Sequence, residues 1–197
     1  MRIARILRLR MCLPLLILLL AGATPLVLAQ VPSANTPAKS EEKYPSNLSR
    51  EIHHQLLVLP YYSVFDSISF TLNGTKVTLT GQVVRPTLRS QAEAAVKSIE
   101  GVVIVVNQIE ILPASPADDE LRRATYRAIF EDATLARYAV QTVPPIHIIV
   151  KNGNVALEGA VESASDRNLA GSRAGGVANV HNVKNNLVVR PKGSAGE

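Results

Sequence analysis

Val77-Thr-Leu-Thr-Gly-Gln-Val83 decides the fold of this chain, because it returns 78 residues later as Val155-Ala-Leu-Glu-Gly-Ala-Val161. In an ungapped comparison of residues 77–111 with residues 155–189, 9 of 35 positions are identical. The identities fall mostly on apolar residues and turn residues, whereas most polar positions differ. A repeat of this kind preserves inward-facing side chains and backbone conformation. The sequence therefore predicts two copies of one small domain.

The first copy predicts the order helix, strand, strand, helix, strand. Apolar residues spaced for one helix face begin at the Ser46-Asn47 cap region and end before Pro60. Alternating apolar residues then form two strands around the turn at Asn73-Gly74, which is typical of a β-hairpin. A second helical pattern ends at Gly101, and a closing strand runs to Ile111.

The second copy repeats this order. Ser115 is a favoured helix cap, with Pro116 in the first turn and acidic residues at 118–120 near the positive end of the helix dipole. A hairpin follows around Asn152-Gly153-Asn154, and the last strand ends near Val189. The helix predicted between this hairpin and the last strand contains Gly171, Gly175 and Gly176. Each glycine costs about 1 kcal/mol relative to alanine in a helix interior. This helix is therefore expected to be short or irregular.

Two residue types recur at equivalent places with structural interpretations. Gly81 and Gly159 interrupt a strand, where a missing side chain permits a bulge or a close approach by the following helix. Asn107 and Asn185 lie near the start of the last strand, where backbone hydrogen bonding is favoured over ligand binding.

Residues 1–29 have the composition of a secretory signal peptide. Four arginines precede an apolar run from Leu13 to Leu20, and a small-residue cleavage pattern ends at Ala29. The run is shorter than the about 20 residues of a membrane span, so cleavage is favoured over an uncleaved anchor. The segment holds four of the 21 basic residues, none of the 16 acidic residues and the single cysteine. The remaining chain has a formal net charge of +1, which argues against a nucleic-acid partner.

The two copies resemble the BON domain family. The resemblance lies in the strand with its central glycine, the helix ending Ile99-Glu-Gly-Val102, and the last strand Val105-Val-Asn-Gln-Ile109, all echoed in residues 155–187. Asn179 stands where the first copy has Gly101. The tandem arrangement is similar to that of OsmY-like periplasmic proteins. It implies an α+β fold of two αββαβ domains, each a small three-stranded sheet packed on two helices.

The sequence predicts the following division of the chain: a signal peptide at 1–29, a disordered tether at 30–46, a first domain at 47–112, a short linker at 113–117, a second domain at 118–190 and a disordered tail at 191–197. Because the linker is short, the two copies are expected to pack against each other.

The sequence offers no pattern typical of catalysis. The four histidines lack the spacing that brings ligands to one metal, and no nucleophile motif or phosphate-cradling loop is present. The acidic residues at 118–120 are interpreted as a helix start in preference to a catalytic pair. We therefore expect no enzyme activity, no metal, no cofactor and no small-molecule substrate, since a carrier would need a cavity that such small domains rarely supply.

Six residues are candidates for contact with a membrane or a partner. They are aromatic residues between the first helix and the hairpin and basic residues of the second-copy helix: Tyr61, Tyr62, Phe65, Arg122, Arg123 and Arg127. For the three aromatic residues, filling the core is favoured over contact with lipid headgroups. Arg123 and Arg127 share a helix face, whereas Arg122 lies about 100° away.

The resemblance implies an exported, periplasmic protein that binds phospholipid surfaces and supports envelope integrity under osmotic or related stress. The alternative is an interaction module that binds another envelope protein or peptidoglycan through a sheet edge or a helix face.

Overall fold

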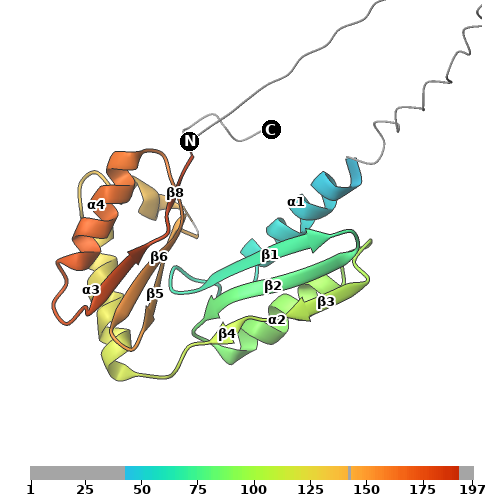
Figure 1. Cartoon of the computed structure of the whole chain (residues 1–197), viewed down its shortest axis with the longest axis horizontal. Helices are drawn as coiled ribbons and strands as arrows, with labels where there is room; N and C mark the ends of the chain where they lie inside the picture. Colours follow the sequence, from blue (N-terminus) through green and yellow to red (C-terminus); the bar gives the residue numbers. More distant parts are fainter. Residues whose placement is uncertain (1–42, 142, 191–197) are drawn as a thin grey trace, which may run out of the picture. The chain divides into compact units, whose positions relative to one another are not determined.

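The computed structural model describes residues 43–141 and 143–190, and it confirms the predicted α+β fold with two αββαβ copies (Figure 1). The predicted signal peptide, most of the tether and the tail lie outside these residues. The first copy contains α1 (Lys43–Leu57), β1 (Ser67–Asn73), β2 (Lys76–Val83), α2 (Pro86–Lys97), β3 (Ile104–Asn107) and β4 (Glu110–Ile111). The second contains α3 (Pro116–Phe130), the 3₁₀ helix η1 (Ala136–Val140), β5 (Ile146–Lys151), β6 (Asn154–Val161), α4 (Ala164–Gly175), β7 (Asn182–Asn185) and β8 (Val188–Val189).

Each sheet has the same topology. β1 pairs antiparallel with β2, which pairs in parallel with β3 and then with β4. β5, β6, β7 and β8 repeat this arrangement. The single closing strand predicted for each copy is thus interrupted. At the break, the Gln108 N–H donates to the Leu79 carbonyl at 2.8 Å, and the Asn186 N–H donates to the Leu157 carbonyl at 2.9 Å.

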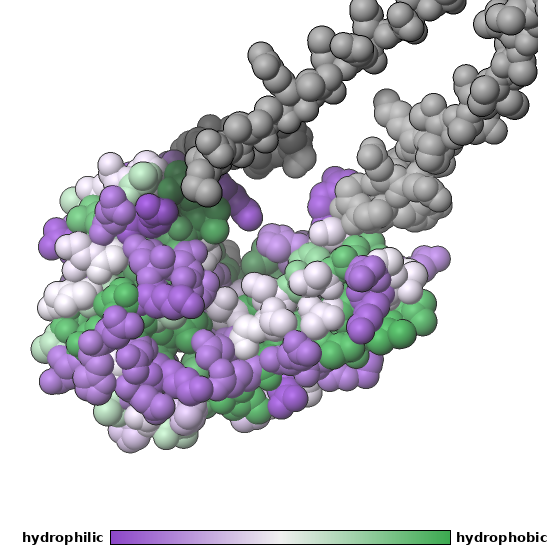
Figure 2. All heavy atoms as spheres, viewed as in Figure 1, coloured by the Kyte–Doolittle hydropathy of each residue, from purple (hydrophilic) through white to green (hydrophobic). Residues whose placement is uncertain are grey.

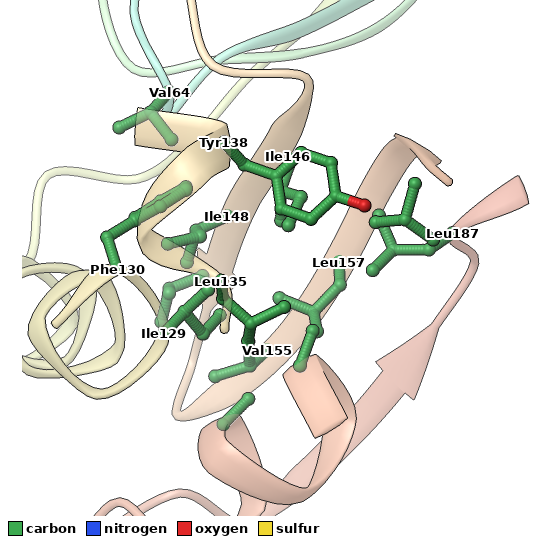
Figure 3. Close-up of a cluster of buried hydrophobic side chains, with 14 of the residues drawn as sticks. Val64, Ile129, Phe130, Leu135, Tyr138, Ile146, Ile148, Val155, Leu157 and Leu187 are labelled. Atoms are coloured by element: carbon green, nitrogen blue, oxygen red, sulfur yellow. The ribbon is translucent and has the colours of Figure 1, made fainter. Parts of the chain in front are cut away.

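The two central strands carry equivalent core residues. Leu79 pairs with Phe70 and Leu157 pairs with Ile148, and both leucines are fully buried. In the first copy, residues of α1 and α2 pack with the inward face of β2. In the second copy, residues from α3, η1 and α4 pack around Leu157 and Ile148 (Figure 3). Each copy is therefore a sheet covered by helices on one face.

Gly81 and Gly159 have positive φ angles of 120° and 109°. A Cβ at Gly81 would lie 2.1 Å from the Ser67 carbonyl oxygen, and one at Gly159 would lie 2.1 Å from the Pro145 carbonyl oxygen. The close approach therefore comes from the neighbouring strand of the hairpin, and the following helix does not cause it. Only glycine combines this backbone conformation with this contact at low cost.

Two helices differ from expectation. α1 begins at Lys43, which lies before the predicted cap at Ser46-Asn47. α4 is neither short nor irregular, because it has 12 residues like α2. A Cβ at Gly171 would lie 2.7 Å from the Asn185 side-chain amide nitrogen. The absence of a side chain at Gly171 therefore allows β7 to pack close to α4. Asn179 adopts a φ of 67° where Gly101 has 93°, so it provides the left-handed turn that follows the helix.

Asp118 ties the start of α3 to the hairpin turn of its sheet. Ser115 caps the helix, with its hydroxyl accepting from the Asp118 N–H at 3.2 Å. The Asp118 carboxylate, which is 2% exposed, accepts from the N–H groups of Asn152 and Gly153, each at 2.9 Å. Asp118 therefore stabilises the turn between β5 and β6, in addition to interacting favourably with the dipole of α3.

Candidate functional site

Residues 60–66, here named the aromatic loop, connect α1 to β1 and contact the second copy. Val64 is buried within the second-copy core, near Phe130 and Ile148 (Figure 3). Its carbonyl accepts from the Ile148 N–H of β5 at 2.7 Å. Phe65 packs against the same core. Val64 and Phe65 thus pack into the core of the second copy, whereas Tyr62 of the same loop packs against the core of the first.

Asp66 holds the end of the aromatic loop in shape. Its carboxylate is 1% exposed and accepts from the Ser63 N–H at 3.1 Å, the Ser63 hydroxyl at 2.7 Å and the Val84 N–H at 2.8 Å. These bonds compensate for burial of a charged group, which is costly without partners. They also fix the loop beside the segment that joins β2 to α2.

The three aromatic candidates lie in different environments. Tyr61 is 69% exposed, with a φ of 66°, and the Arg85 guanidinium lies over its ring at 4.9 Å. Burial raises the pKa of Tyr62 to about 12, and its ring lies 5.5 Å from the ring of His147. Phe65 contacts Tyr126 of α3 in an edge-to-face pair, with ring centroids 6.2 Å apart. Tyr62 and Phe65 therefore pack inward, whereas Tyr61 is presented to solvent.

The three basic candidates divide in the same way. Arg122 is 3% exposed, donates to the Val150 carbonyl at 2.8 Å and pairs with Asp119. This burial removes Arg122 from the surface contact set, because its guanidinium is committed to the second copy. Arg123 and Arg127 are exposed and lie 2.9 Å and 4.0 Å from the carboxylate of Glu120.

Two neighbouring hollows bring the candidates together. The first, here named the aromatic cleft, has a volume of about 290 Å³ and is lined by Phe65, Tyr126, Arg123 and Arg127. The second, here named the arginine pocket, has a volume of about 360 Å³ and shares Phe65 and Arg123 with the cleft. Its other lining residues include Tyr61, Tyr62, Arg122 and Arg85.

Two of the aromatic and basic residues that line these hollows, Tyr126 and Arg85, were absent from the sequence-based set. Tyr126 lies three positions after Arg123 on α3, a spacing that places two side chains on neighbouring parts of a helix surface. That spacing was the available signal for Tyr126. Arg85 gave no local signal, because its position beside Tyr61 depends on the fold of the aromatic loop. On the face shown in Figure 2, hydrophilic residues cover much of the second copy, and hydrophobic ones lie in small separate areas.

The equivalent asparagines have backbone partners in both copies. The Asn107 side-chain amide donates to the Arg89 carbonyl at 2.9 Å, and that of Asn185 donates to the Arg167 carbonyl at 2.6 Å. Their side-chain oxygens accept from the backbone N–H two residues later. These bonds join each last strand to the preceding helix, and they account for the asparagines without a ligand.

Within residues 43–141 and 143–190, no three histidine or acidic side chains gather as metal ligands would. His147 is the histidine with a perturbed environment, since burial lowers its pKa. In the same part of the chain, no helix combines the length and apolar character needed to cross a bilayer.

Comparison with known proteins gives a family and distant structural likenesses. The family model described as the BON domain matches residues 65–113 and 118–191, together more than half of the chain. The chain is similar to CdsD, described as a structural protein of the type III secretion system of Chlamydia trachomatis, with 14% identity, a TM-score of 0.31, and coverage of 75% of this chain and 94% of that one. For the C-terminal domain of CdsD the values are 15% identity, a TM-score of 0.27, and coverage of 74% and 98%.

None of the curated proteins matches the sequence. The family match, in contrast, falls once on each copy of the repeat. Residues 65–113 span β1 to β4 of the first copy, and residues 118–191 span nearly all of the second copy. The chain therefore belongs to the BON domain family and carries two of these domains in tandem.

Proposed function

We propose that this is a non-catalytic, exported binding protein of the periplasm that associates with anionic phospholipid surfaces and supports envelope integrity under osmotic or related stress. Membership of the BON family supports a binding role at the envelope. One observation carries the lipid assignment: the aromatic cleft is lined by two aromatic residues, Phe65 and Tyr126, together with the exposed Arg123 and Arg127.

The chemistry of the aromatic cleft suits the interfacial layer of a membrane. An aromatic ring with a polar group, such as that of Tyr126, favours the headgroup region, and Phe65 adds apolar surface. Basic side chains near an anionic surface each contribute at most about 1 kcal/mol. Arg123 and Arg127 give a weak attraction, because the carboxylate of Glu120 beside them offsets part of their charge. The net charge of +1 expected after signal removal adds little to it. Binding is therefore expected to be weak and to decrease as salt is added.

Vesicle co-sedimentation tests the proposal with the chain lacking residues 1–29. Wild-type protein should sediment with vesicles that contain anionic lipid and remain in solution with neutral vesicles. The double variant Arg123→Ala/Arg127→Ala should lose most of this binding. Its matched control is Arg89→Ala/Arg167→Ala, which removes the same charge from exposed, equivalent positions of the two copies. Equal binding by both double variants would reject the aromatic cleft as the contact, and no binding by wild type would reject the lipid partner.

The second candidate is an interaction module for another envelope protein or for peptidoglycan. The observation that favours it is the outer strand β3, which pairs only with β2 in the described sheet and begins beside Val103, 74% exposed, and Ile104, 51% exposed. A free strand edge with apolar side chains is suited to pairing with an extended segment. Absence of vesicle binding, together with cross-linking of envelope proteins or peptidoglycan through position 103 or 104, would favour this function.

A further inference from the structure

We infer that the arginine pocket is a binding site for a small oxyanion of the phosphate class, recognised mainly by Arg85 and Arg123. The inference goes beyond the proposed function, because it assigns a ligand class to a second hollow, which shares only Phe65 and Arg123 with the aromatic cleft. The pocket, with a volume of about 360 Å³, lies at the low end of the size range of ligand sites and suits a phosphate with a few attached atoms.

The first support is the state of the charged groups around the pocket. Three guanidinium groups and two carboxylates line it. Both carboxylates are already engaged, since Asp66 accepts three hydrogen bonds within its own segment and Asp119 pairs with Arg122. Neither carboxylate is therefore a partner of Arg85 or Arg123. Arg123 lies 2.9 Å from Glu120, which does not line the pocket.

Arg85 is the arginine of the pocket whose guanidinium N–H groups are available to a ligand. It is exposed, and within the described residues it lies within 4.0 Å of no carboxylate oxygen, while its guanidinium rests over the Tyr61 ring at 4.9 Å. Stacking on an aromatic face leaves the N–H groups in the guanidinium plane able to donate. A phosphate oxygen pair matches that planar arrangement and can accept two hydrogen bonds at once.

The second support is a buried cation at the same pocket. Arg122 lines the pocket while being 3% exposed, and its Nε is buried with no hydrogen-bond partner among the described residues. A buried N–H without a partner costs free energy. The buried positive charge of Arg122 in the lining of the pocket favours an anion there, although Asp119 neutralises part of that charge.

The third support is the backbone of Tyr61. Its φ of 66° is uncommon for a residue with a side chain, and conformations of this kind cost about 1–3 kcal/mol. The strained backbone accompanies an exposed ring lying under Arg85. We assign this strain to holding the Arg85 guanidinium at the rim of the pocket.

A titration with inorganic phosphate tests the inference. The probe is added to ¹⁵N-labelled protein at constant ionic strength, with chloride as the compensating anion, and the amide signals of residues 61–66, 84 and 85 are followed. Saturable shifts at these amides are expected. Arg85→Ala should weaken phosphate binding about tenfold, since it removes charge-assisted hydrogen bonds, and Arg85→Lys should restore only part of the affinity.

The Arg85→Ala variant is expected to fold normally. Arg85 precedes α2 as its cap residue but makes no side-chain capping hydrogen bond. Arg89→Ala is the matched control, because it removes the same charge one turn further along α2 outside the pocket, and it should bind phosphate as wild type does. Shifts that fail to saturate, or that Arg85→Ala leaves unchanged, would overturn the inference.

A second arm identifies the source of the oxyanion. If anionic vesicles displace phosphate and Arg85→Ala weakens vesicle binding, the pocket takes a lipid headgroup. If phosphate saturates the pocket while vesicles do not bind, the pocket serves a soluble phosphate compound, and the lipid proposal fails alone. If vesicles bind but phosphate produces no saturable shift, the lipid proposal stands and the oxyanion site is rejected.

Discussion

At the scale of single residues, the repeat is visible in side chains whose environments are the same in both copies. Leu79 and Leu157 occupy matching places in β2 and β6 and are fully buried. Changing either to alanine should cost about 2–5 kcal/mol in free energy of unfolding, because the removed methyl groups leave a cavity. Urea unfolding of each variant measures the loss. Negligible loss in both variants would mean that the repeat alignment does not describe the two cores.

Gly81 allows a sharper test of the hairpin. Its φ is 120°, and an added Cβ would lie 2.1 Å from the Ser67 carbonyl oxygen. Gly81→Ala should destabilise the protein by about 1–3 kcal/mol from the backbone conformation alone, with the clash in addition. Gly74→Ala is the control, because Gly74 also has a positive φ but an added Cβ there meets nothing within 4 Å. Thermal unfolding should show the larger loss for Gly81→Ala, and equal losses would contradict the close contact.

At the scale of helices and strands, Asp118 links α3 to the turn between β5 and β6. Asp118→Asn keeps the shape of the side chain but directs an amide group toward two N–H donors. The loss of a charged acceptor and the facing donors should cost about 1–3 kcal/mol. Hydrogen exchange at the amides of Asn152 and Gly153 should quicken in this variant. Glu131→Gln, which removes the same charge from an exposed position at the other end of α3, is the comparison, and it should leave those two amides protected.

The order of the helices and strands could be predicted from local sequence patterns. The breaks in the closing strands and the regularity of α4 could not. Helical spacing and strand alternation report which residues turn inward, so the two αββαβ units could be predicted from the sequence. The interruption of each closing strand depends on Asn107 and Asn185, whose hydrogen bonds reach a helix 18 positions earlier in the chain. The regular α4 depends on Gly171 facing Asn185. Such long-range pairs leave no periodic signal.

The candidate site shows the same limit. Its aromatic and basic residues could be selected by type, and the fold brings five of the original six around the arginine pocket. The burial of Arg122 depends on its bond to the Val150 carbonyl of β5, which is 28 positions away. The inclusion of Arg85 depends on the aromatic loop meeting the segment after β2. Residue type therefore indicates a site, and tertiary contacts decide its members.

At the scale of the whole molecule, His147 makes stability depend on pH. Burial lowers its pKa below the usual value of about 6.5. As pH falls below about 6.5, the unfolded chain takes up this proton before the folded chain does, so the free energy of unfolding decreases. The contribution is fully present above the unfolded pKa and is lost as pH falls through the folded pKa.

Urea unfolding at pH 7.5, 6.5 and 5.5 measures this effect. His147→Phe keeps a ring beside Tyr62 and should have a flatter dependence on pH over this interval than wild type. His53→Ala, which changes an exposed histidine of α1, should keep the wild-type dependence. An unchanged slope in His147→Phe would show that another group controls the response to acid.

The packing of Val64 into the second core affects how the number of repeats can change during evolution. Arrays of similar repeats can gain or lose a copy through recombination, provided that each repeat contacts its neighbours in the same way. Here the core of the second copy includes Val64 from the segment before the first hairpin. Deletion of the first copy would leave a vacancy in the second, and deletion of the second would expose Val64 and Phe65. Selection should therefore hold the number of copies at two, and mutations at position 64 should be tolerated only with compensating changes in the second copy.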